Sequence, residues 1–569
     1  MTINDKIKKE VVKLLAKHEI KIKADELAVP PSQEMGDLAL PCFNLAKKYN
    51  KTAPEAAQYI VDNIKPHGLI INIKNIGPYV NFLFDFNKIA ELVIKEINRK
   101  KNNYGKIHLG KGQKIMIEYS QPNTHKEFHI GHLRNVCLGI SLINIYKNCG
   151  YKVIAANYIG DSGAHVAKTL WYYKNFLTKT DFPAEPKERG EFLGQIYARA
   201  SAKVEEKLDY KNEVQDVLQK LENNDPYYTK LWQQTKKWSM DQFKQIYQEL
   251  GAKFNVYFYE SVEEKEGKKM LPQLLKQEFI RESEGAIIAD LQKYDLGILV
   301  LVREDGTSLY GIKDIPLGIK KFKKYKLAKS IYIVDNRQSQ YLQQIFKILE
   351  LIGHKNEMVH VPYEFVKLKS GIMASRTGNV VTYNEVKQVA LQKVMAETKQ
   401  RHADWSAKKI EETSLAIVMA ALKFGMLKSN NNKIITFDIE ESLDINGFTG
   451  PYLQYSYARI NSIFKKLKTP FVATKIDYQA LATDIEKQLI KDLIHYPDVL
   501  QEALQINDPS VIIQYVYKLA QDLNTFYHEL PVLKADKDIK LARLTLLKAV
   551  KQVLHNSMAI LGIPIISEM

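Results

Sequence analysis

The hydrophobic and polar positions of the first 110 residues or so mix two periods. Stretches with helical spacing alternate with short strand-like runs, and residues 70–73 and 77–82 predict two strands joined by a turn. The block has its own apolar periodicity. We therefore expect a small separate α/β domain over residues 1–112.

The pattern changes at Lys114. Residues 115–119 form a compact apolar run, a polar loop covers 120–128, and apolar side chains then recur at helical spacing from His129 to Ile143. A second strand is expected at 151–156. Strand, loop, helix and strand within about 40 residues predict a βαβ unit, and hence a parallel sheet of Rossmann type with a right-handed crossover.

Later segments extend this picture. Residues 185–250 are charged and helical in pattern, which predicts a helical insertion lying over the sheet, while 297–302 and 330–334 are apolar runs expected to build the second half of that sheet. From about residue 384 the pattern is helical only. The predicted organisation is α/β followed by all-α: an N-terminal domain over 1–112, a Rossmann-type sheet domain with that insertion over 113–383, a helical junction over 384–436 and an all-helical domain over 437–569.

Composition narrows the class of protein. Hydrophobic residues make up 45% and charged residues 26% of the 569 residues, which is typical of a globular protein. No run reaches the roughly 18 apolar residues of a membrane span, and the first 22 residues do not resemble a signal peptide. The three cysteines form no C-x-x-C pair, so we expect neither disulfides nor a zinc site, and a cytoplasmic location. The net charge of +17 fits a polyanionic partner such as nucleic acid, although lysine-rich surfaces also simply maintain solubility.

The sharpest chemical signal is the sequence His129-Ile130-Gly131-His132, placed where the loop after the first strand opens into a helix. A helix N-terminus at the mouth of a parallel sheet presents free N–H groups to phosphate, and two imidazoles there could hydrogen-bond to an α-phosphate during its reaction. Gly131 would leave room for a nucleotide against the backbone. Two surface histidines at a helix start are the alternative.

Residues 118–135, E-Y-S-Q-P-N-T-H-K-E-F-H-I-G-H-L-R-N, resemble the extended HIGH signature of arginyl-tRNA synthetases, including the S-x-P-N-x-x-K element that distinguishes this family within class I. Residues 158–163 resemble its G-D-x-G segment. Residues 450–460 resemble the start of its helical anticodon-binding domain, and Gly36-Asp37 with Gly77-Pro78 resemble elements of its extra N-terminal domain, which would contact tRNA. The similarity covers essentially the whole chain.

The resemblance implies an ATP site. His129, Gly131, His132 and Lys126 would bind ATP, with Lys126 neutralising its phosphates. The segment 372–381, I-M-A-S-R-T-G-N-V-V, lies where the family has a KMSKS-like loop, but the usual mobile lysine is absent. Met373, Ser375 and Arg376 are the ATP-binding candidates there, and Arg376 with Lys126 would offset the charge of departing pyrophosphate. Read alone, this segment is more typical of a hairpin.

Selection of arginine needs carboxylates that pair with a planar guanidinium. Tyr310 and Asp314 are spaced i, i+4, which on its own indicates a structural pair on one helical face. The resemblance implies instead that both residues bind the substrate, with Asp314 at the guanidinium. The other candidate residues for arginine are Gln338, Asn123, Ser120, His132 and, as a second carboxylate, Glu260.

The implied activity is an arginine–tRNA ligase that uses ATP with Mg²⁺ and no zinc, acts on tRNA(Arg), and in this family usually needs bound tRNA for activation. We expect a monomer with no membrane association. The alternatives are another class I synthetase, a small-molecule nucleotidyltransferase that shares H-x-G-H, and a non-catalytic RNA-binding relative; the eroded KMSKS loop slightly favours the last.

Overall fold

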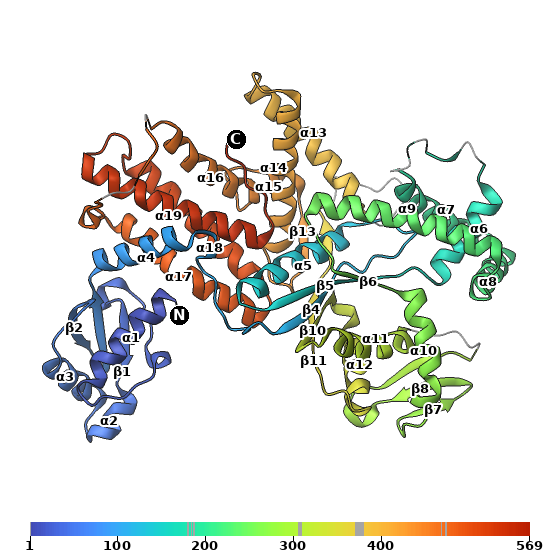
Figure 1. The fold of residues 1–569 in the computed structure, drawn as a ribbon, viewed down its shortest axis with the longest axis horizontal. Helices are drawn as coiled ribbons and strands as arrows, with labels where there is room; N and C mark the ends of the chain where they lie inside the picture. The colour runs from blue at the N-terminus through green and yellow to red at the C-terminus, as the bar shows by residue number, and fades with distance from the viewer. Residues whose placement is uncertain are drawn as a thin grey trace.

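The computed structural model describes all residues except 1, 179–180, 184, 186–187, 305–309, 370–380, 468 and 473–474. Its N-terminal unit (blue in Figure 1) is a three-stranded antiparallel sheet of order β1-β3-β2 with helices beside it. The predicted strand pair is confirmed as a hairpin. The elements are α1 (Ile3–Ala16), β1 (Leu38–Pro41), α2 (Phe43–Tyr49), α3 (Ala53–Asn63), β2 (Ile70–Ile76), β3 (Tyr79–Phe84) and α4 (Phe86–Lys100).

The centre of the molecule is a five-stranded parallel sheet of order β11-β10-β4-β5-β6. The βαβ unit is confirmed, with a long buried helix between its first two strands. Its elements are β4 (Lys114–Glu118), α5 (Ile130–Asn148), β5 (Lys152–Ile159), β6 (Val256–Tyr259), β10 (Lys329–Asp335) and β11 (Glu357–Tyr363).

Successive side chains of a strand point to opposite faces of the sheet, and this alternation determines which helix each face contacts. Ile115 and Ile117 of β4 pack in the core that includes α5, whereas Met116 packs in a second core with Leu317 and Phe322 of α11. Helix α5 therefore covers one face of the sheet and α11 covers the other. The remaining helices of this half are α10 (Glu260–Leu274), α11 (Tyr310–Tyr325) and α12 (Ser339–Leu351).

The strand predicted at 297–302 exists but does not belong to the parallel sheet. It is β9 (Ile298–Val302), the edge of a separate antiparallel sheet with β7 (Ile280–Ser283) and β8 (Ala286–Asp290). A short apolar run predicts a buried strand without identifying its partner, and here the neighbouring hairpin supplies that partner. The run at 330–334 is confirmed in the parallel sheet as part of β10.

The helical insertion extends to one side of the sheet rather than over it (Figure 1). It begins before residue 185, with α6 (Ala164–Phe176), and continues through α7 (Arg189–Val204), α8 (Leu208–Glu222) and α9 (Pro226–Leu250). Helices α6, α8 and the first half of α9 share their own apolar core around Trp171. Only the second half of α9, from Met240 to Leu250, joins the main core.

The described residues of the C-terminal part form helices, as predicted, apart from one short strand. Residues Ile435–Phe437 form the short strand β13, which pairs with β12 (Val366–Leu368) in parallel. The signal was missed because the strand has only three residues. The helices are α13 (Tyr383–Arg401), α14 (Ala407–Leu427), α15 (Ile439–Leu443), α16 (Gly450–Lys465), α17 (Asp484–Ile506), α18 (Ser510–Glu529) and α19 (Lys537–Leu561).

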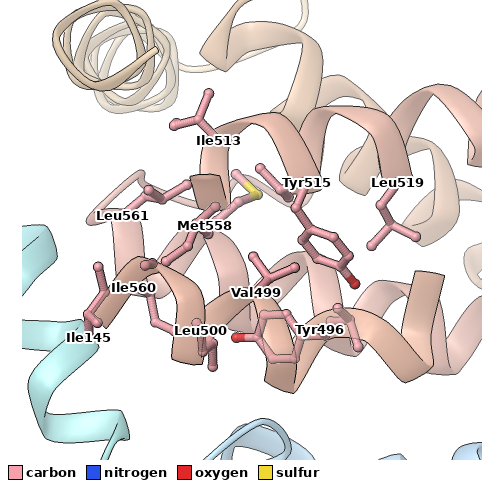
Figure 2. Packing of buried hydrophobic residues seen from close by; sticks show 14 of the residues in the cluster. Ile145, Tyr496, Val499, Leu500, Ile513, Tyr515, Leu519, Met558, Ile560 and Leu561 are labelled. Carbon is pink, nitrogen blue, oxygen red and sulfur yellow. The ribbon is translucent and has the colours of Figure 1, made fainter. Parts of the chain in front are cut away.

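Apolar packing joins the C-terminal helices to the sheet domain. Figure 2 shows Leu500 of α17, Ile513 of α18 and Met558 of α19 in one buried cluster that Ile145 of α5 also enters. The helix that begins at the H-x-G-H sequence is thus held along its length by both domains. Among the described residues, no helix is long and apolar enough to cross a bilayer.

Candidate active site

The loop between β4 and α5 has an unusual backbone that its neighbours hold in place. Ser120, Gln121 and His125 adopt positive φ values of 80°, 43° and 64°. The amide of Ser120 donates to Asn135 of α5, and the amide of Gln121 donates to Asn157 of β5 at 3.1 Å. Side chains from two separate elements therefore fix the shape of the loop that leads into the histidine pair.

The two histidines of the motif cap the helix that they begin. The Nδ1 atom of His129 accepts from the amides of Gly131 and His132, at 3.1 and 3.3 Å, and the amide of His129 donates to Nδ1 of His132 at 3.2 Å. The two rings stack with centroids 3.8 Å apart. Because each Nδ1 accepts, the proton of each neutral ring lies on Nε2, which remains a donor.

Both imidazoles are neutral at physiological pH. Burial, together with the charges of Lys126 and Arg337, lowers the pKa of His129 to about 4. Burial and the neighbouring ring of His129 lower the pKa of His132 well below its usual value. The pair can therefore act as hydrogen-bond donors toward a phosphate, while positive charge must come from Lys126 and other cations.

Lys126 lies on the wall of a cavity of about 730 Å³ between α10 and the helical insertion. Its Nζ atom is 5.1 Å from the ring centre of Tyr197 of α7. The other wall residues include His165, Trp232, Glu260 and Lys313. The cavity thus borders both the predicted ATP side and the predicted arginine side of the site.

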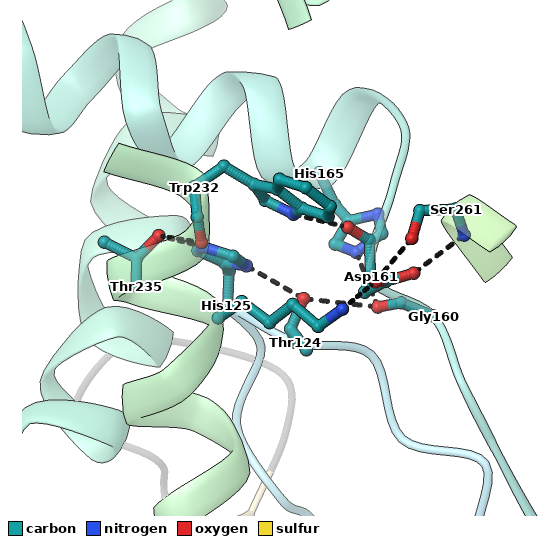
Figure 3. Close-up of polar contacts among 9 residues, drawn as sticks. Thr124, His125, Gly160, Asp161, His165, Trp232, Thr235 and Ser261 are labelled. Carbon is teal, nitrogen blue, oxygen red and sulfur yellow. Dashed lines mark hydrogen bonds and ion pairs between the residues drawn. The ribbon is translucent and has the colours of Figure 1, made fainter. Parts of the chain in front are cut away.

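A polar network lies beside this cavity (Figure 3). Four of its residues, Asp161, His165, Trp232 and Ser261, also line the cavity wall. His125 is fully buried, its ring lies between the hydroxyls of Thr124 and Thr235 at 2.9 and 2.8 Å, and burial lowers its pKa to about 3. The buried Asp161 accepts from both the amide and the hydroxyl of Ser261, each at 2.8 Å. These contacts join the end of β5 to α9 and α10.

Sequence reasoning missed this network. Asp161 also accepts from Lys236 of α9, and its carbonyl accepts from Trp232 at 2.8 Å. Asp161 belongs to the G-D-x-G segment, which was the available signal, but its partners lie 71 to 100 residues away in the chain.

On the arginine side, Asp314 is partly buried in the first turns of α11, and its Oδ2 accepts a hydrogen bond from Tyr341 of α12. Burial raises the pKa of Asp314 to about 6, against the opposing effect of that hydrogen bond. Residue Tyr310 starts the same helix, as expected, but its side chain lies outside the described residues.

The nearby carboxylates are paired with lysines of α11. Glu260 accepts from Nζ of Lys313 at 3.0 Å, and Glu118 lies 2.7 Å from Nζ of Lys321, both acids and both lysines being buried. Glu260 is thus near the pocket but already holds a cation. Glu118 and its pairing with Lys321 were not predicted.

The other predicted residues lie at the carboxyl ends of the strands. Asn123 forms a parallel bridge to Gly160, where a Cβ would lie 2.0 Å from the Oδ1 atom of Asn123, so only glycine fits. The hydroxyl of Ser120 lies 2.7 Å from that of Tyr247. Gln338 is exposed at the end of the short 3₁₀ helix Asn336–Gln338 that follows β10.

Met373, Ser375 and Arg376 lie outside the described residues. The chain immediately after them contacts the histidine motif: the carbonyl of Val381 accepts from Ile130 at 3.2 Å, and the amide of Tyr383 donates to Phe128 at 2.9 Å. Residues 381–383 are therefore anchored beside the N-terminus of α5.

Comparisons with known proteins agree along the chain. A family described as "tRNA synthetases class I (R), catalytic domain" matches residues 93–439, "Arginyl tRNA synthetase N terminal domain" matches 1–84, and "DALR anticodon binding domain" matches 453–569. The chain belongs to the arginyl-tRNA synthetase family.

Individual relatives support this assignment. A curated arginine–tRNA ligase of Bdellovibrio bacteriovorus is 35% identical over 548 residues, which cover 95% of this chain and 93% of that protein. The ligase of Clostridioides difficile is 33% identical over 556 residues, 97% of each chain. The solved arginyl-tRNA synthetase of Thermus thermophilus is 25% identical with a TM-score of 0.81 and full coverage of both chains. The predictions of the family, the fold class and an arginine–tRNA ligase activity are confirmed.

Proposed function

We propose that the residues at the carboxyl edge of the central sheet carry out arginine activation and transfer in two steps. The carboxylate of L-arginine attacks the α-phosphorus of ATP, which forms arginyl-adenylate and releases pyrophosphate. A hydroxyl of the terminal adenosine of tRNA(Arg) then attacks the activated carbonyl, and AMP leaves. No protein nucleophile is required; the protein aligns the reactants and stabilises charge.

The observation that carries this proposal is the pair of neutral imidazoles at the N-terminus of α5. Each keeps an Nε2–H donor free of the capping bonds, and the helix end adds its own field. In this account the imidazoles of His129 and His132 hydrogen-bond to the α-phosphate, with Gly131 leaving space for the nucleotide. Lys126 offsets the phosphate charge, and Met373, Ser375 and Arg376 act at the departing pyrophosphate. Mg²⁺ is expected to come with ATP.

Asp314 is the proposed anchor for the guanidinium. Two other acids of the region already pair with lysines, Glu118 with Lys321 and Glu260 with Lys313, whereas Asp314 has a neutral hydroxyl donor in Tyr341. Tyr310, Gln338, Asn123 and Ser120 complete the proposed arginine site. We further propose the domain limits given above, a monomer, and a cytoplasmic location.

Charging of purified tRNA transcripts tests the proposed partner. The protein should attach [¹⁴C]arginine to transcripts of tRNA(Arg) but not to transcripts for other amino acids at the same concentration. Equal charging of non-cognate transcripts would contradict the assignment of tRNA(Arg), and a chain that binds tRNA without charging any of it would favour a non-catalytic RNA-binding role.

A further inference from the structure

Tyr158, which was not predicted to bind arginine, lies among the acids of the proposed arginine site. Tyr158 is near the carboxyl end of β5, on the same face of the strand as Ile154 and Ala156, and these side chains pack in the core beneath α11. Glu118 occupies the equivalent face of the neighbouring strand β4, where it meets Lys321 of α11. Tyr158 therefore points toward the helix that carries Asp314.

The hydroxyl of Tyr158 is buried and has no hydrogen-bond partner, although its ring remains partly exposed. Buried phenol hydroxyls in folded proteins are usually hydrogen-bonded, so an unpaired one at a substrate site points to a missing ligand group. Ser162, a little further along the same strand end and on the wall of the large cavity, also has a buried hydroxyl without a partner.

The charges around this hydroxyl define what it can bind. Burial raises the pKa of Tyr158 well above its usual value, and the negative charges of Asp314, Glu260, Glu118 and Glu263 add to the effect. The phenol is therefore neutral at physiological pH. Glu118 and Glu260 already pair with lysines, whereas Asp314 pairs with the neutral hydroxyl of Tyr341, so a cation with N–H donors is the group that best complements Asp314 and this phenol.

We propose that Tyr158 is a specificity-determining residue of the arginine site, whose hydroxyl oxygen accepts a hydrogen bond from the guanidinium that Asp314 binds. This inference rests on the proposed role of Asp314. A guanidinium has five donors in one plane and can reach a carboxylate along one edge and a phenol oxygen along another. A lysine ammonium, being a compact point charge, does not span both groups in that geometry.

The orientation of Asp314 supports this arrangement. Tyr341 donates to the Oδ2 atom of Asp314, and the two helices that carry these residues are fixed against each other by the core of Ile312, Ile315 and Ile345. The carboxylate is thus held with Oδ1 available. Tyr341 orients the acid, while Tyr158 contacts the substrate directly.

The test is Tyr158→Phe, which keeps the ring and its packing and removes only the hydroxyl. In pyrophosphate–ATP exchange with tRNA present, the KM for arginine should rise roughly 10- to 100-fold, since a hydrogen bond to a charged ligand is lost. The kcat and the KM for ATP should stay within about twofold, because the contact is made equally before and during reaction. Equilibrium dialysis of [¹⁴C]arginine against the protein–tRNA complex should show the same loss of affinity.

The matched control is Tyr325→Phe. Tyr325 packs in the same core at the far end of α11, about 16 Å along the helix from Asp314, and its loss should leave the KM for arginine unchanged. If Tyr158→Phe leaves the KM for arginine unchanged while Asp314→Asn raises it, the proposed role of Tyr158 is overturned and that of Asp314 stands. If Asp314→Asn also leaves the KM unchanged, the arginine site itself is wrongly placed.

Discussion

Replacing Asp314 with asparagine should stabilise the protein at neutral pH while weakening its affinity for arginine. Asparagine keeps the shape of the side chain and can still accept from Tyr341, but it carries no charge. The two effects share one cause, because the ionised carboxylate is held in a site that disfavours it until a guanidinium arrives.

The pKa of Asp314 gives the size of both effects. Burial raises it from 3.8 to about 6, so the folded state holds its proton more tightly than the unfolded state does. Stability therefore falls as pH rises from about 4 to about 6, by up to about 3 kcal/mol at about 1.4 kcal/mol for each pKa unit. This cost is absent below pH 4 and fully present above pH 6, and the asparagine variant does not have it at any pH.

Arginine binding follows the ionised fraction of the same acid. If only the carboxylate binds the guanidinium, a pKa of about 6 predicts that the KM for arginine is about 11-fold higher at pH 5 than its limiting value, and nearly at that limit at pH 7. The asparagine variant should show a high KM that hardly changes over this range.

Thermal unfolding of both proteins from pH 4.5 to 8, together with arginine KM values over the same range, measures these effects. The midpoint of Asp314→Asn should exceed that of the wild type by a few degrees at pH 7, with the difference shrinking toward pH 4.5. A variant that is less stable at pH 7, or a wild-type KM that does not change between pH 5 and 7, would refute this electrostatic account of the pocket.

Three further predictions follow from the same structure. His129→Ala and His132→Ala should each lower kcat roughly 100-fold or more in pyrophosphate exchange. His129→Asn should restore the helix cap and the thermal stability that His129→Ala loses, but not the rate. Near wild-type rates in both alanine variants would show that these rings take no part in the chemistry. Lys321→Met should lower the free energy of unfolding by about 3–5 kcal/mol, because it leaves Glu118 buried and unpaired. Adding Glu118→Gln should recover part of that loss. Equal stability of the single and double variants would contradict the ion pair. The affinity for tRNA in filter binding should fall steeply with salt, as expected for a chain of charge +17, and a flat profile would argue against electrostatic binding.

Much of the fold could be predicted from local sequence patterns. The βαβ unit around α5 was predictable because strand and helix periods change sharply at Lys114 and His129, and the polar loop between them is short. The place of β9 was not predictable, because pairing partners depend on tertiary packing that a five-residue apolar run does not encode. The three-residue strand β13 gives no periodic signal at all.

The residues of the candidate site likewise fall into those that a local motif predicts and those that only tertiary contacts bring together. His129, His132 and Lys126 were found because they lie within seven residues of one another in a motif. Tyr158, Tyr341 and Lys321 were not, since each meets its partners or neighbours across separate elements: Tyr341 reaches Asp314 from 27 residues away, and Lys321 reaches Glu118 across the face of the sheet. Such contacts exist only once α11 has docked on the strands.

Pyrophosphate–ATP exchange with each amino acid in turn, with and without unfractionated tRNA, tests the central claim most directly. Exchange with arginine alone, and only when tRNA is present, is the result that this account predicts. Exchange supported by another amino acid would show that the pocket around Asp314 has been misread, and no exchange under any condition would contradict the enzymatic assignment itself.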